Sequence, residues 1–212
     1  MKSIHLAIFD WNGTLLNDLA VAYKSVKKIF KTFGVSPPSF QEYRDEIQTN
    51  YRGFYLDHGI PFNVTNERMN EIRHTVFKKN WQTTKLHAQA LQFVLLCKNN
   101  SLKTAIVSGE TSAILRKRLS QFGLENIFDS ISGDVKNKKV ALRNVLDEFS
   151  IKNPKNAFYV DDSIDGLKSA LYIGIYAFAF GKGYCPPLKL SRTNPTLLFN
   201  EYSQLINLMN FV

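Results

Sequence analysis

Short apolar runs alternate with amphipathic segments along most of the chain. The runs are rich in β-branched and aromatic residues, and the segments between them carry apolar residues at helical spacing. This alternation predicts a parallel sheet with helices on both faces, because parallel strands need crossover connections that are usually helical. The expected strands are residues 4–10, 104–107, 130–132, 157–160 and 175–180, with an edge strand at 196–199.

The helices expected around this sheet follow the same pattern. Gly123 and Gly174 stop two of them, since glycine readily adopts the left-handed conformation that ends a helix. The expected helices are residues 111–122, 139–149, 164–173 and 201–208.

Residues 16–87 differ from the rest of the chain, because they show helical periodicity and few strand-like runs. Ala22, Val26 and Phe30 form an apolar stripe on one expected helix. Two more helices are expected, at 40–49 and 66–79, separated by prolines. The predicted organisation is therefore a doubly wound, Rossmann-like α/β core with a small helical domain inserted after the first strand. The core comprises residues 1–15 and 88–212, and the insert comprises 16–87.

Composition places the chain among ordinary globular proteins. It has 212 residues, of which 44% are hydrophobic and 13% aromatic, and this length can bury a substantial core. Its apolar runs are much shorter than the roughly 20 residues of a membrane-spanning helix. Cys97 and Cys185 are the only cysteines, and their spacing suggests neither a disulfide framework nor a metal site. We expect a soluble, cytoplasmic protein with no membrane partner.

The formal net charge of +9 raises the question of nucleic-acid binding. The lysines and arginines are scattered, however, and no recognisable nucleic-acid module accompanies them. We expect no specific nucleic-acid partner. A basic surface also attracts anionic, phosphorylated small molecules.

The first candidate for chemistry is the stretch Asp10-Trp11-Asn12-Gly13-Thr14, which directly follows an apolar strand. A carboxylate at the carboxyl end of a parallel strand lies where open α/β sheets bind ligands. Its oxygen can attack phosphorus and form an aspartyl phosphate. An aspartate in this position also often does no more than cap a turn.

Two further elements follow later strands. Ser108-Gly109-Glu110 offers a hydroxyl and backbone amides that can hold phosphoryl oxygens at a helix start, although such a serine is often only a cap. The basic run from Lys136 to Lys139 opens an expected helix, and a lysine there can neutralise charge on a transferring phosphoryl group.

A cluster of acids ends another expected strand. Asp161, Asp162 and Asp165 lie within five residues of one another. Like charges so close repel one another unless a cation offsets them, and carboxylate oxygens suit Mg²⁺. A capped, solvent-facing turn explains these acids equally well.

Together, in this order, the four elements resemble the four motifs of the haloacid dehalogenase (HAD) superfamily, and the layout is most similar to its phosphoglycolate-phosphatase-like members. The resemblance covers residues 4–180 and implies that the helical insert is the cap of these enzymes. It implies a magnesium-dependent phosphatase acting on a small phosphorylated metabolite. The oligomeric state is left open.

The resemblance assigns roles to individual residues. It implies that Asp10 is the nucleophile, that Ser108 and Gly109 bind the phosphoryl group, and that Lys138 neutralises its charge, with Lys136 and Lys139 as fallbacks. It implies metal ligation by Asp10, by the backbone carbonyl of Asn12 and by Asp162, with Asp161 and Asp165 as supporting acids.

Asn12 departs from the family pattern, which usually has a second aspartate two residues after the nucleophile to donate a proton and later activate water. An amide cannot exchange a proton at useful pH. Three hypotheses follow: a slow enzyme or one restricted to good leaving groups, a proton supplied by another residue, or a protein that binds phosphorylated ligands without turnover. His58, His74 and His87 are candidate proton carriers only by residue type.

Two alternatives to a phosphatase remain. A metal-independent haloacid dehalogenase would also form an ester at Asp10, but it has no use for clustered acids. A phospholigand-binding protein is favoured by Asn12 alone. Tyr51, Arg52 and Tyr55 are candidates for facing a substrate from the insert, although helix packing explains them equally well.

Overall fold

A computed structural model describes residues 4–47 and 51–210. Six parallel strands form one sheet in the order β5-β4-β1-β6-β7-β8, which confirms the predicted α/β class. The strands are β1 (Leu6–Phe9), β4 (Lys103–Val107), β5 (Ser130–Ser132), β6 (Ala157–Asp161), β7 (Tyr176–Phe180) and β8 (Leu197–Phe199).

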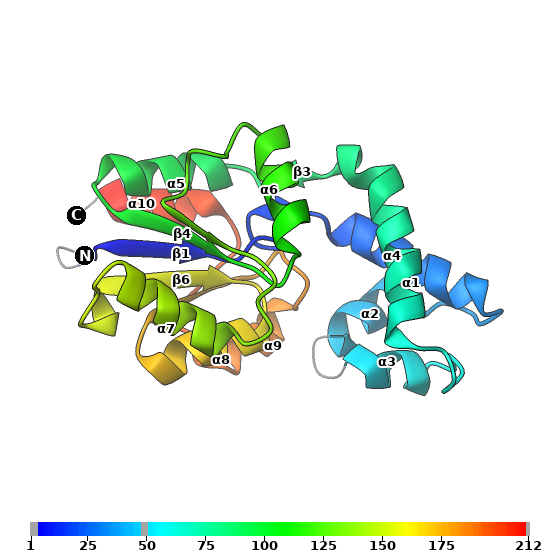
Figure 1. The fold of residues 1–212 in the computed structure, drawn as a ribbon. Helices are drawn as coiled ribbons and strands as arrows, with labels where there is room; N and C mark the ends of the chain where they lie inside the picture. The colour runs from blue at the N-terminus through cyan, green and yellow to red at the C-terminus, as the bar shows by residue number, and fades with distance from the viewer. Residues whose placement is uncertain (1–3, 48–50, 211–212) are drawn as a thin grey trace.

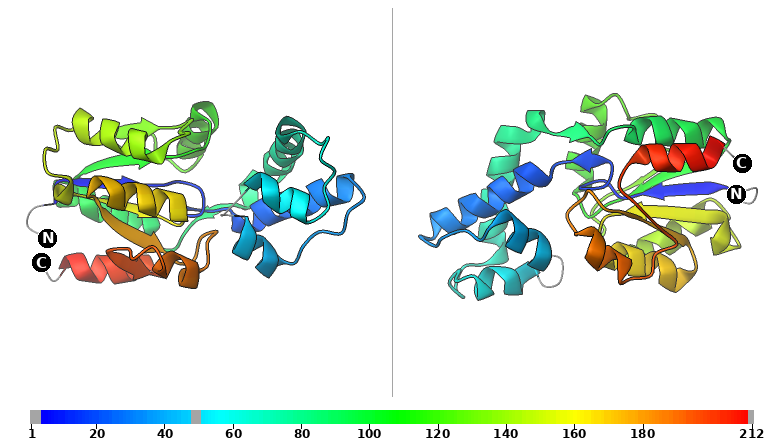
Figure 2. Two further views of the ribbon diagram at one scale, coloured as in Figure 1. Left: turned by 90° about the horizontal axis from the view of Figure 1, so that it is seen from below. Right: turned by 180° about the vertical axis from the view of Figure 1, so that it is seen from behind.

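Helices cover both faces of this sheet, as Figures 1 and 2 show. Successive side chains of β1 point to opposite faces, so that Phe9 joins one hydrophobic cluster and Ile8 the other. Burial on both faces explains why the strands are continuous apolar runs. The first cluster involves α5 (Ala90–Asn99), α6 (Ser112–Gln121) and α10 (Tyr202–Asn210), and the second involves α7 (Lys138–Glu148), α8 (Ile164–Ile173) and α9 (Pro187–Ser191).

The register of the central strands decides where the candidate residues lie. Phe9, the last residue of β1, pairs with Ile106 of β4 and with Val160 of β6. The residues that follow these strands therefore emerge side by side at one edge of the sheet. Asp10, Ser108 and Asp161 come from these three strand ends.

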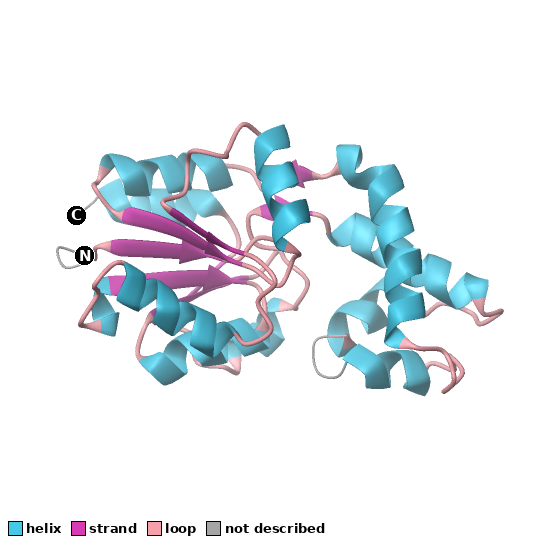
Figure 3. Cartoon of the chain, viewed as in Figure 1, coloured by secondary structure: helices cyan, strands magenta, loops and turns pink. Residues whose placement is uncertain are grey.

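A separate group of helices lies beyond this edge, and Figure 3 shows that it contains no part of the main sheet. These helices bury their own hydrophobic cluster, in which Phe30, Phe54 and Met69 pack together. They are α1 (Leu19–Thr32), α2 (Phe40–Glu46), α3 (Tyr51–Asp57) and α4 (Asn66–Asn80), followed by the short 3-10 helix η1 (Trp81–Thr83). We call them the helical unit.

Two short antiparallel strands join the helical unit to the core. In β2 (Leu16–Asn17) and β3 (Lys85–Leu86), Leu16 pairs with Leu86 and Asn17 pairs with Lys85. The chain thus leaves and returns through neighbouring segments. We propose 16–87 as the inserted domain because these paired strands lie at its two ends.

Several elements were not predicted from the sequence. Helix α5 has an apolar run without an obvious polar face, and it buries Phe93, Val94 and Cys97 in the first hydrophobic cluster. Helix α3 has seven residues, too few for clear periodicity, and the linker strands have two each. The helix expected at 40–49 ends at Glu46, and residues 48–50 lie outside the described ranges. A further 3-10 turn, η2 (Pro154–Asn156), precedes β6.

Among the residues described, no helix combines the length and apolar character needed to cross a membrane.

Candidate active site

Asp10 directly follows the central strand β1 and is 7% exposed. The turn after it is tight, with Gly13 at a φ of +80°. A Cβ at Gly13 would lie 2.5 Å from Asp162 Oδ2 and 2.3 Å from the Tyr184 ring. Glycine is therefore required here both by the backbone conformation and by the close approach of the acidic residue.

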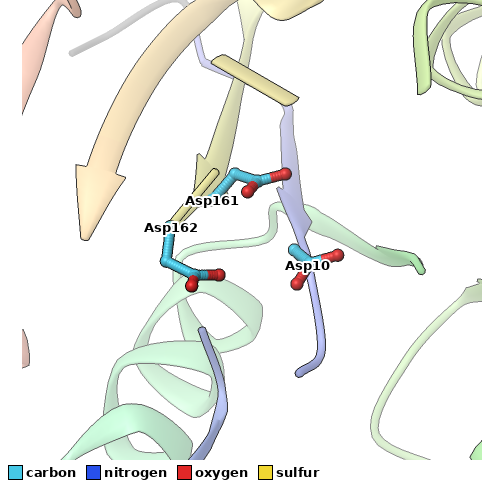
Figure 4. Close-up of side chains that lie close together, drawn as sticks. All are labelled: Asp10, Asp161 and Asp162. Carbon is cyan, nitrogen blue, oxygen red and sulfur yellow. The ribbon is translucent and has the colours of Figure 1, made fainter. Parts of the chain in front are cut away.

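Asp10, Asp161 and Asp162 form a compact acidic cluster, shown in Figure 4. Each offers one carboxylate oxygen, and these oxygens lie within 4.8 Å of one another. All three residues are buried. The convergence of acids from two strand ends, which the sequence motifs led us to expect, is present in the structure.

Hydrogen bonds fix the orientation of the two acids at the carboxyl end of β6. The Thr14 hydroxyl donates to Asp162 Oδ1 at 2.8 Å, and the Tyr184 amide donates to Asp162 Oδ2 at 2.6 Å. The Ser163 amide donates to Asp161 Oδ1 at 2.6 Å. The two carboxylates are thus held by their surroundings before any ligand binds.

Lys138 is the cation of the cluster. It is the first residue of α7, and its ammonium group forms ion pairs with Asp10 and with Asp161, the latter at 3.4 Å. It also donates to the Val107 carbonyl at 3.0 Å and to the Tyr159 hydroxyl at 2.7 Å. Four residues from three neighbouring strands or their ends therefore meet at one ammonium group.

The two fallback lysines point elsewhere. Lys136 is exposed in the loop before α7. The Lys139 ammonium lies over the Tyr172 ring, 4.3 Å from its centroid. The phase of the α7 helix therefore brings Lys138 to the cluster in place of its neighbours.

Burial and crowding perturb the titration of these groups. Burial, reinforced by Asp161, raises the pKa of Asp10 to about 7 despite the attraction of Lys138. Burial and the other two acids also raise the pKa of Asp162 well above its usual value. For Lys138, burial disfavours the charged form, but Asp10 and Asp161 outweigh it and raise the pKa. Crowding of buried carboxylates therefore favours added positive charge at the cluster.

Ser108 follows β4 and is 1% exposed. Its hydroxyl accepts a hydrogen bond from the Glu110 amide at 3.1 Å, and Ser108, Gly109 and Glu110 all line the cavity that contains the acidic cluster. The structure thus brings the hydroxyl and the loop amides to the same cavity as Asp10.

The Asn12 side chain faces a buried carboxylate. Its Nδ2 donates to Asp18 Oδ2 at 2.7 Å, and the Gly13 amide donates to Asp18 Oδ1 at 3.1 Å. Asp18 is fully buried, and burial raises its pKa. Asp18 was not predicted from the sequence, although an acid shortly after the motif was the available signal.

Other candidates lie away from the cluster. Asp165 is exposed in the first turn of α8, which directs it to solvent, so the structure does not bring this predicted metal ligand to the site. His87 is buried and bonded to the Gly13 carbonyl at 3.1 Å, and His58 pairs with Glu46. Of the three histidines, His74 lines the cavity.

The cavity has a volume of about 990 Å³ and lies between the core and the helical unit. Tyr51 and Tyr55 line it, whereas Arg52 donates to the Phe62 carbonyl at 2.9 Å instead. Two arginines that the sequence analysis did not single out, Arg73 of α4 and Arg118 of α6, also line it. Their presence in the cavity wall depends on how α4 and α6 are oriented relative to each other, and no local sequence motif predicts this orientation.

The parallel α/β sheet thus carries a lysine-paired acidic cluster at the carboxyl ends of its central strands. A family model described as haloacid dehalogenase-like hydrolase matches residues 7–180. The chain belongs to this family, as the four motifs led us to expect, and it is a hydrolase of the phosphatase type.

Relatives agree with this assignment. The chain is 25% identical to a phosphoglycolate phosphatase of Vibrio cholerae, with 99% of this chain and 98% of the relative covered. The crystal structure of a putative phosphoglycolate phosphatase from Lactobacillus plantarum superposes with a TM-score of 0.82 at 15% identity, covering 97% of this chain and 99% of that one. CbbY from Rhodobacter sphaeroides, solved in complex with phosphate, gives 0.76 at 19% identity, with 95% and 96% covered.

Proposed function

We propose that the protein is a magnesium-dependent phosphohydrolase that acts on a small phosphorylated metabolite through an aspartyl phosphate at Asp10. The observation that carries this proposal is the joining of Asp10, two further carboxylates and Lys138 in one buried cluster. Two relatives that are named phosphoglycolate phosphatase support it.

The residues present fit a divalent cation. Hard carboxylate oxygens are the ligands that Mg²⁺ prefers, and a carboxylate cluster with raised pKa values favours added positive charge. Asp10, Asp161, Asp162 and the Asn12 carbonyl would hold the ion. When bound, Mg²⁺ would offset the negative charge of the acids and of the phosphoryl oxygens.

The chain's own groups account for the first chemical step. An Asp10 carboxylate oxygen attacks phosphorus, the new oxygen–phosphorus bond forms, and the bond to the leaving oxygen breaks. Ser108, the neighbouring loop amides and Lys138 hold the phosphoryl oxygens and stabilise their charge. The ion pair with Lys138 also favours the ionised form of Asp10, which is the form that attacks.

The second step returns Asp10 to its starting state. Water attacks phosphorus, the acyl phosphate bond breaks, and inorganic phosphate leaves. The Asn12 amide cannot give a proton to the leaving oxygen or take one from water, and Asp18 accepts a hydrogen bond from its Nδ2. Slow turnover and a preference for good leaving groups therefore belong to the proposal, with the departing oxygen protonated by solvent.

The helical unit would act as the cap. Its side chains form one wall of the cavity, so it can exclude water and select the substrate. A reducing, cytoplasmic setting fits Cys97 and Cys185, which are both buried and unpaired.

Phosphate release tests the proposal directly. The protein is incubated with acyl phosphates, phosphoglycolate, sugar phosphates and nucleotides, with Mg²⁺ and with EDTA, beside an Asp10→Asn variant. We expect release that needs both Mg²⁺ and Asp10, fastest with acyl phosphates. Release that persists in EDTA, or in the Asp10→Asn variant, would refute the mechanism.

The bond between Asn12 and Asp18 favours a second candidate, a phospholigand-binding protein without turnover. In that case the whole panel would be silent, while calorimetry would show Asp10-dependent binding of a phosphorylated compound in the presence of Mg²⁺. The acidic cluster argues against the dehalogenase alternative, and halide release without metal would be the result that favours it.

A further inference from the structure

One loop of the core is hydrogen-bonded to the helical unit and to the acidic cluster at the same time. The loop follows β7, and two of its residues, Gly183 and Tyr184, make these contacts; we call them the bridging segment. The Tyr184 amide donates to Asp162 Oδ2 at 2.6 Å. From the helical unit, Arg44 of α2 donates through Nη2 to the Gly183 carbonyl at 3.0 Å and through Nε to the Tyr184 carbonyl at 3.3 Å. The bridging segment therefore lies between a guanidinium of the helical unit and a carboxylate of the cluster.

A single peptide group makes the two innermost contacts. The Gly183 carbonyl and the Tyr184 amide belong to one planar peptide unit, whose oxygen and hydrogen point in opposite directions. Arg44 binds the oxygen of this unit, and Asp162 accepts from its N–H. A rotation that carries the oxygen away from Arg44 also turns the N–H away from Asp162. The guanidinium and the carboxylate are thus coupled through a rigid unit.

The bridging segment also packs tightly on both sides. Gly183 is buried, and a Cβ at this position would lie 2.3 Å from Cβ and from Oδ2 of Asp162. Glycine is required here because the backbone approaches the acidic residue so closely. The Tyr184 side chain packs against the hydrophobic cluster of the helical unit. The position of the segment therefore depends on the helical unit and constrains Asp162.

The two oxygens of Asp162 accept hydrogen bonds from different parts of the molecule. Oδ1 accepts from the Thr14 hydroxyl, in the turn that follows β1. Oδ2 accepts from the Tyr184 amide, whose peptide unit is bound by Arg44. The core alone supplies the first donor, whereas the position of the second also depends on α2.

A second contact joins α2 to the core without involving the bridging segment. The ammonium group of Lys189, in α9, donates to the carbonyl of Asp45, the residue after Arg44. Lys189 and Arg44 each carry one positive charge, and each holds α2 against the core. Only the Arg44 contact leads to Asp162, so the two residues form a natural pair for comparison.

We propose that Arg44 is a positioning residue for the acidic cluster, which fixes the Asp162 carboxylate by holding the peptide group between Gly183 and Tyr184. The inference rests on the proposed function, because Asp162 is one of the carboxylates that would hold Mg²⁺. Loss of a group that hydrogen-bonds a metal ligand typically lowers metal affinity about 10- to 100-fold, and Arg44 acts one bond further out, so we expect about three- to tenfold. The helical unit thus supports metal binding in the core as well as forming a wall of the cavity.

The first measurement needs neither metal nor turnover. Hydrogen exchange of the Tyr184 amide is followed by NMR on protein that carries isotope-labelled tyrosine, in the wild type, in Arg44→Met and in Lys189→Met. Lys189→Met is the matched control, because it removes the same charge and a contact of α2 with the core. We expect the Tyr184 amide to exchange about tenfold faster or more in Arg44→Met, in the range of one lost hydrogen bond, and at nearly the wild-type rate in Lys189→Met.

Calorimetric titration with Mg²⁺ then measures the consequence at the cluster. The dissociation constant of Mg²⁺ should rise about three- to tenfold in Arg44→Met and change little in Lys189→Met. The direction of the change separates positioning from charge, since removing a positive charge near a cation site by itself tightens cation binding.

Three results would overturn the inference: unchanged Tyr184 exchange in Arg44→Met, equal changes in the two variants, or Mg²⁺ affinity in Arg44→Met that matches or exceeds that of the wild type. Failure of the proposed function is distinguishable from these. A wild type that binds no Mg²⁺ would refute that function, while faster Tyr184 exchange in Arg44→Met alone would still show that Arg44 positions the carboxylate. Mg²⁺-dependent phosphate release with unchanged exchange would keep the function and reject the role of Arg44.

Discussion

The two charged regions of the cavity are built in opposite ways. At the strand ends, three carboxylates are held by the Thr14 hydroxyl, by backbone amides and by Lys138. Between α4 and α6, Arg73 and Arg118 both lie over the Phe77 ring, and Nη1 of Arg118 is buried without a hydrogen-bond partner within the described residues. The first region is fixed by directed hydrogen bonds before a ligand arrives, whereas the second holds its cations against an aromatic ring.

This difference follows from the elements that carry the residues. The acids extend from adjacent strands of a buried sheet, where the register sets their positions within narrow limits. Arg73 belongs to a helical unit joined to the core through two short strands. Reacting groups need fixed positions, whereas the surface that admits and selects a substrate needs freedom to move.

The largest expected effect comes from the centre of the preorganised region. Asp10→Asn removes the nucleophile while keeping its size, so Mg²⁺-dependent phosphate release should fall at least about 10³-fold. Asp165→Asn is the matched control, since Asp165 is exposed in the first turn of α8, and it should retain activity. Steady-state assays with acetyl phosphate provide the measurement. Equal losses in the two variants would contradict the placement of the site.

Removing the cation of the acidic cluster should have the next largest effect. Lys138→Met leaves Asp10 and Asp161 without their ion pairs and removes a donor to the phosphoryl oxygens. We expect kcat to fall roughly 10²- to 10³-fold, in the range seen for single groups that stabilise developing charge. Lys139→Met, which loses only its contact with Tyr172, should leave kcat nearly unchanged. Similar activities of the two variants would show that Lys138 has no role in turnover.

A gain of activity is expected at Asn12. Asn12→Asp introduces a group that can exchange protons, but it places a second carboxyl group beside Asp18, where Nδ2 of Asn12 lies 2.7 Å away. Combining it with Asp18→Asn exchanges the two side chains and restores a donor to the pair. The double variant should release phosphate from an alkyl phosphate about 10²-fold faster than the wild type, and the single variant should gain less. No gain in the double variant would show that Asn12 does not limit turnover.

The smallest expected effect is on the stability of the fold, and it comes from His87, which is bonded to the turn that follows β1. Burial lowers the pKa of His87 to about 4 from its usual 6.5, although its bond to the Gly13 carbonyl opposes the shift. Its neutral form therefore stabilises the fold above pH 6.5, and this contribution is lost as the pH falls from 6.5 towards 4.

Denaturant unfolding at pH 7 and pH 4 measures this contribution. The wild type should lose roughly 2 kcal/mol more unfolding free energy over this interval than His87→Gln, whose side chain does not titrate. His5→Gln serves as the control, because His5 is exposed, and it should follow the wild type. Identical pH dependence in all three proteins would show that His87 is not buried in the neutral state.

Much of the core site was predictable because its signals are local. Asp10, Ser108 and Asp161 each follow an apolar run, and strand ends of a parallel sheet share one edge, so order along the chain predicted their meeting in space. The segments predicted as core strands, as well as the edge strand at 196–199, are strands in the structure. The choice of Lys138 over its neighbour Lys139 depends in addition on the phase of helix α7, which decides which of the two side chains faces the acidic cluster.

The rest depends on contacts between distant segments. Arg73 and Arg118 come together at the Phe77 ring because α4 faces α6, and no residue spacing in the sequence predicts this orientation. Asp18 was missed because its interaction with Asn12 requires the fold of the turn. Asp165 matched the acidic pattern, but the first turn of α8 directs it to solvent.

The central claim is that the preorganised acids make Asp10 the nucleophile that attacks phosphorus. Acid quenching followed by mass spectrometry tests this claim most directly. The protein is mixed with acetyl phosphate and Mg²⁺, quenched and digested. We predict a phosphate adduct on Asp10 that requires Mg²⁺ and accumulates more in the wild type than in the Asn12→Asp/Asp18→Asn variant, because Asn12 cannot activate water for its hydrolysis. Metal-dependent turnover with no adduct at Asp10, or with an adduct on another residue, would contradict the account.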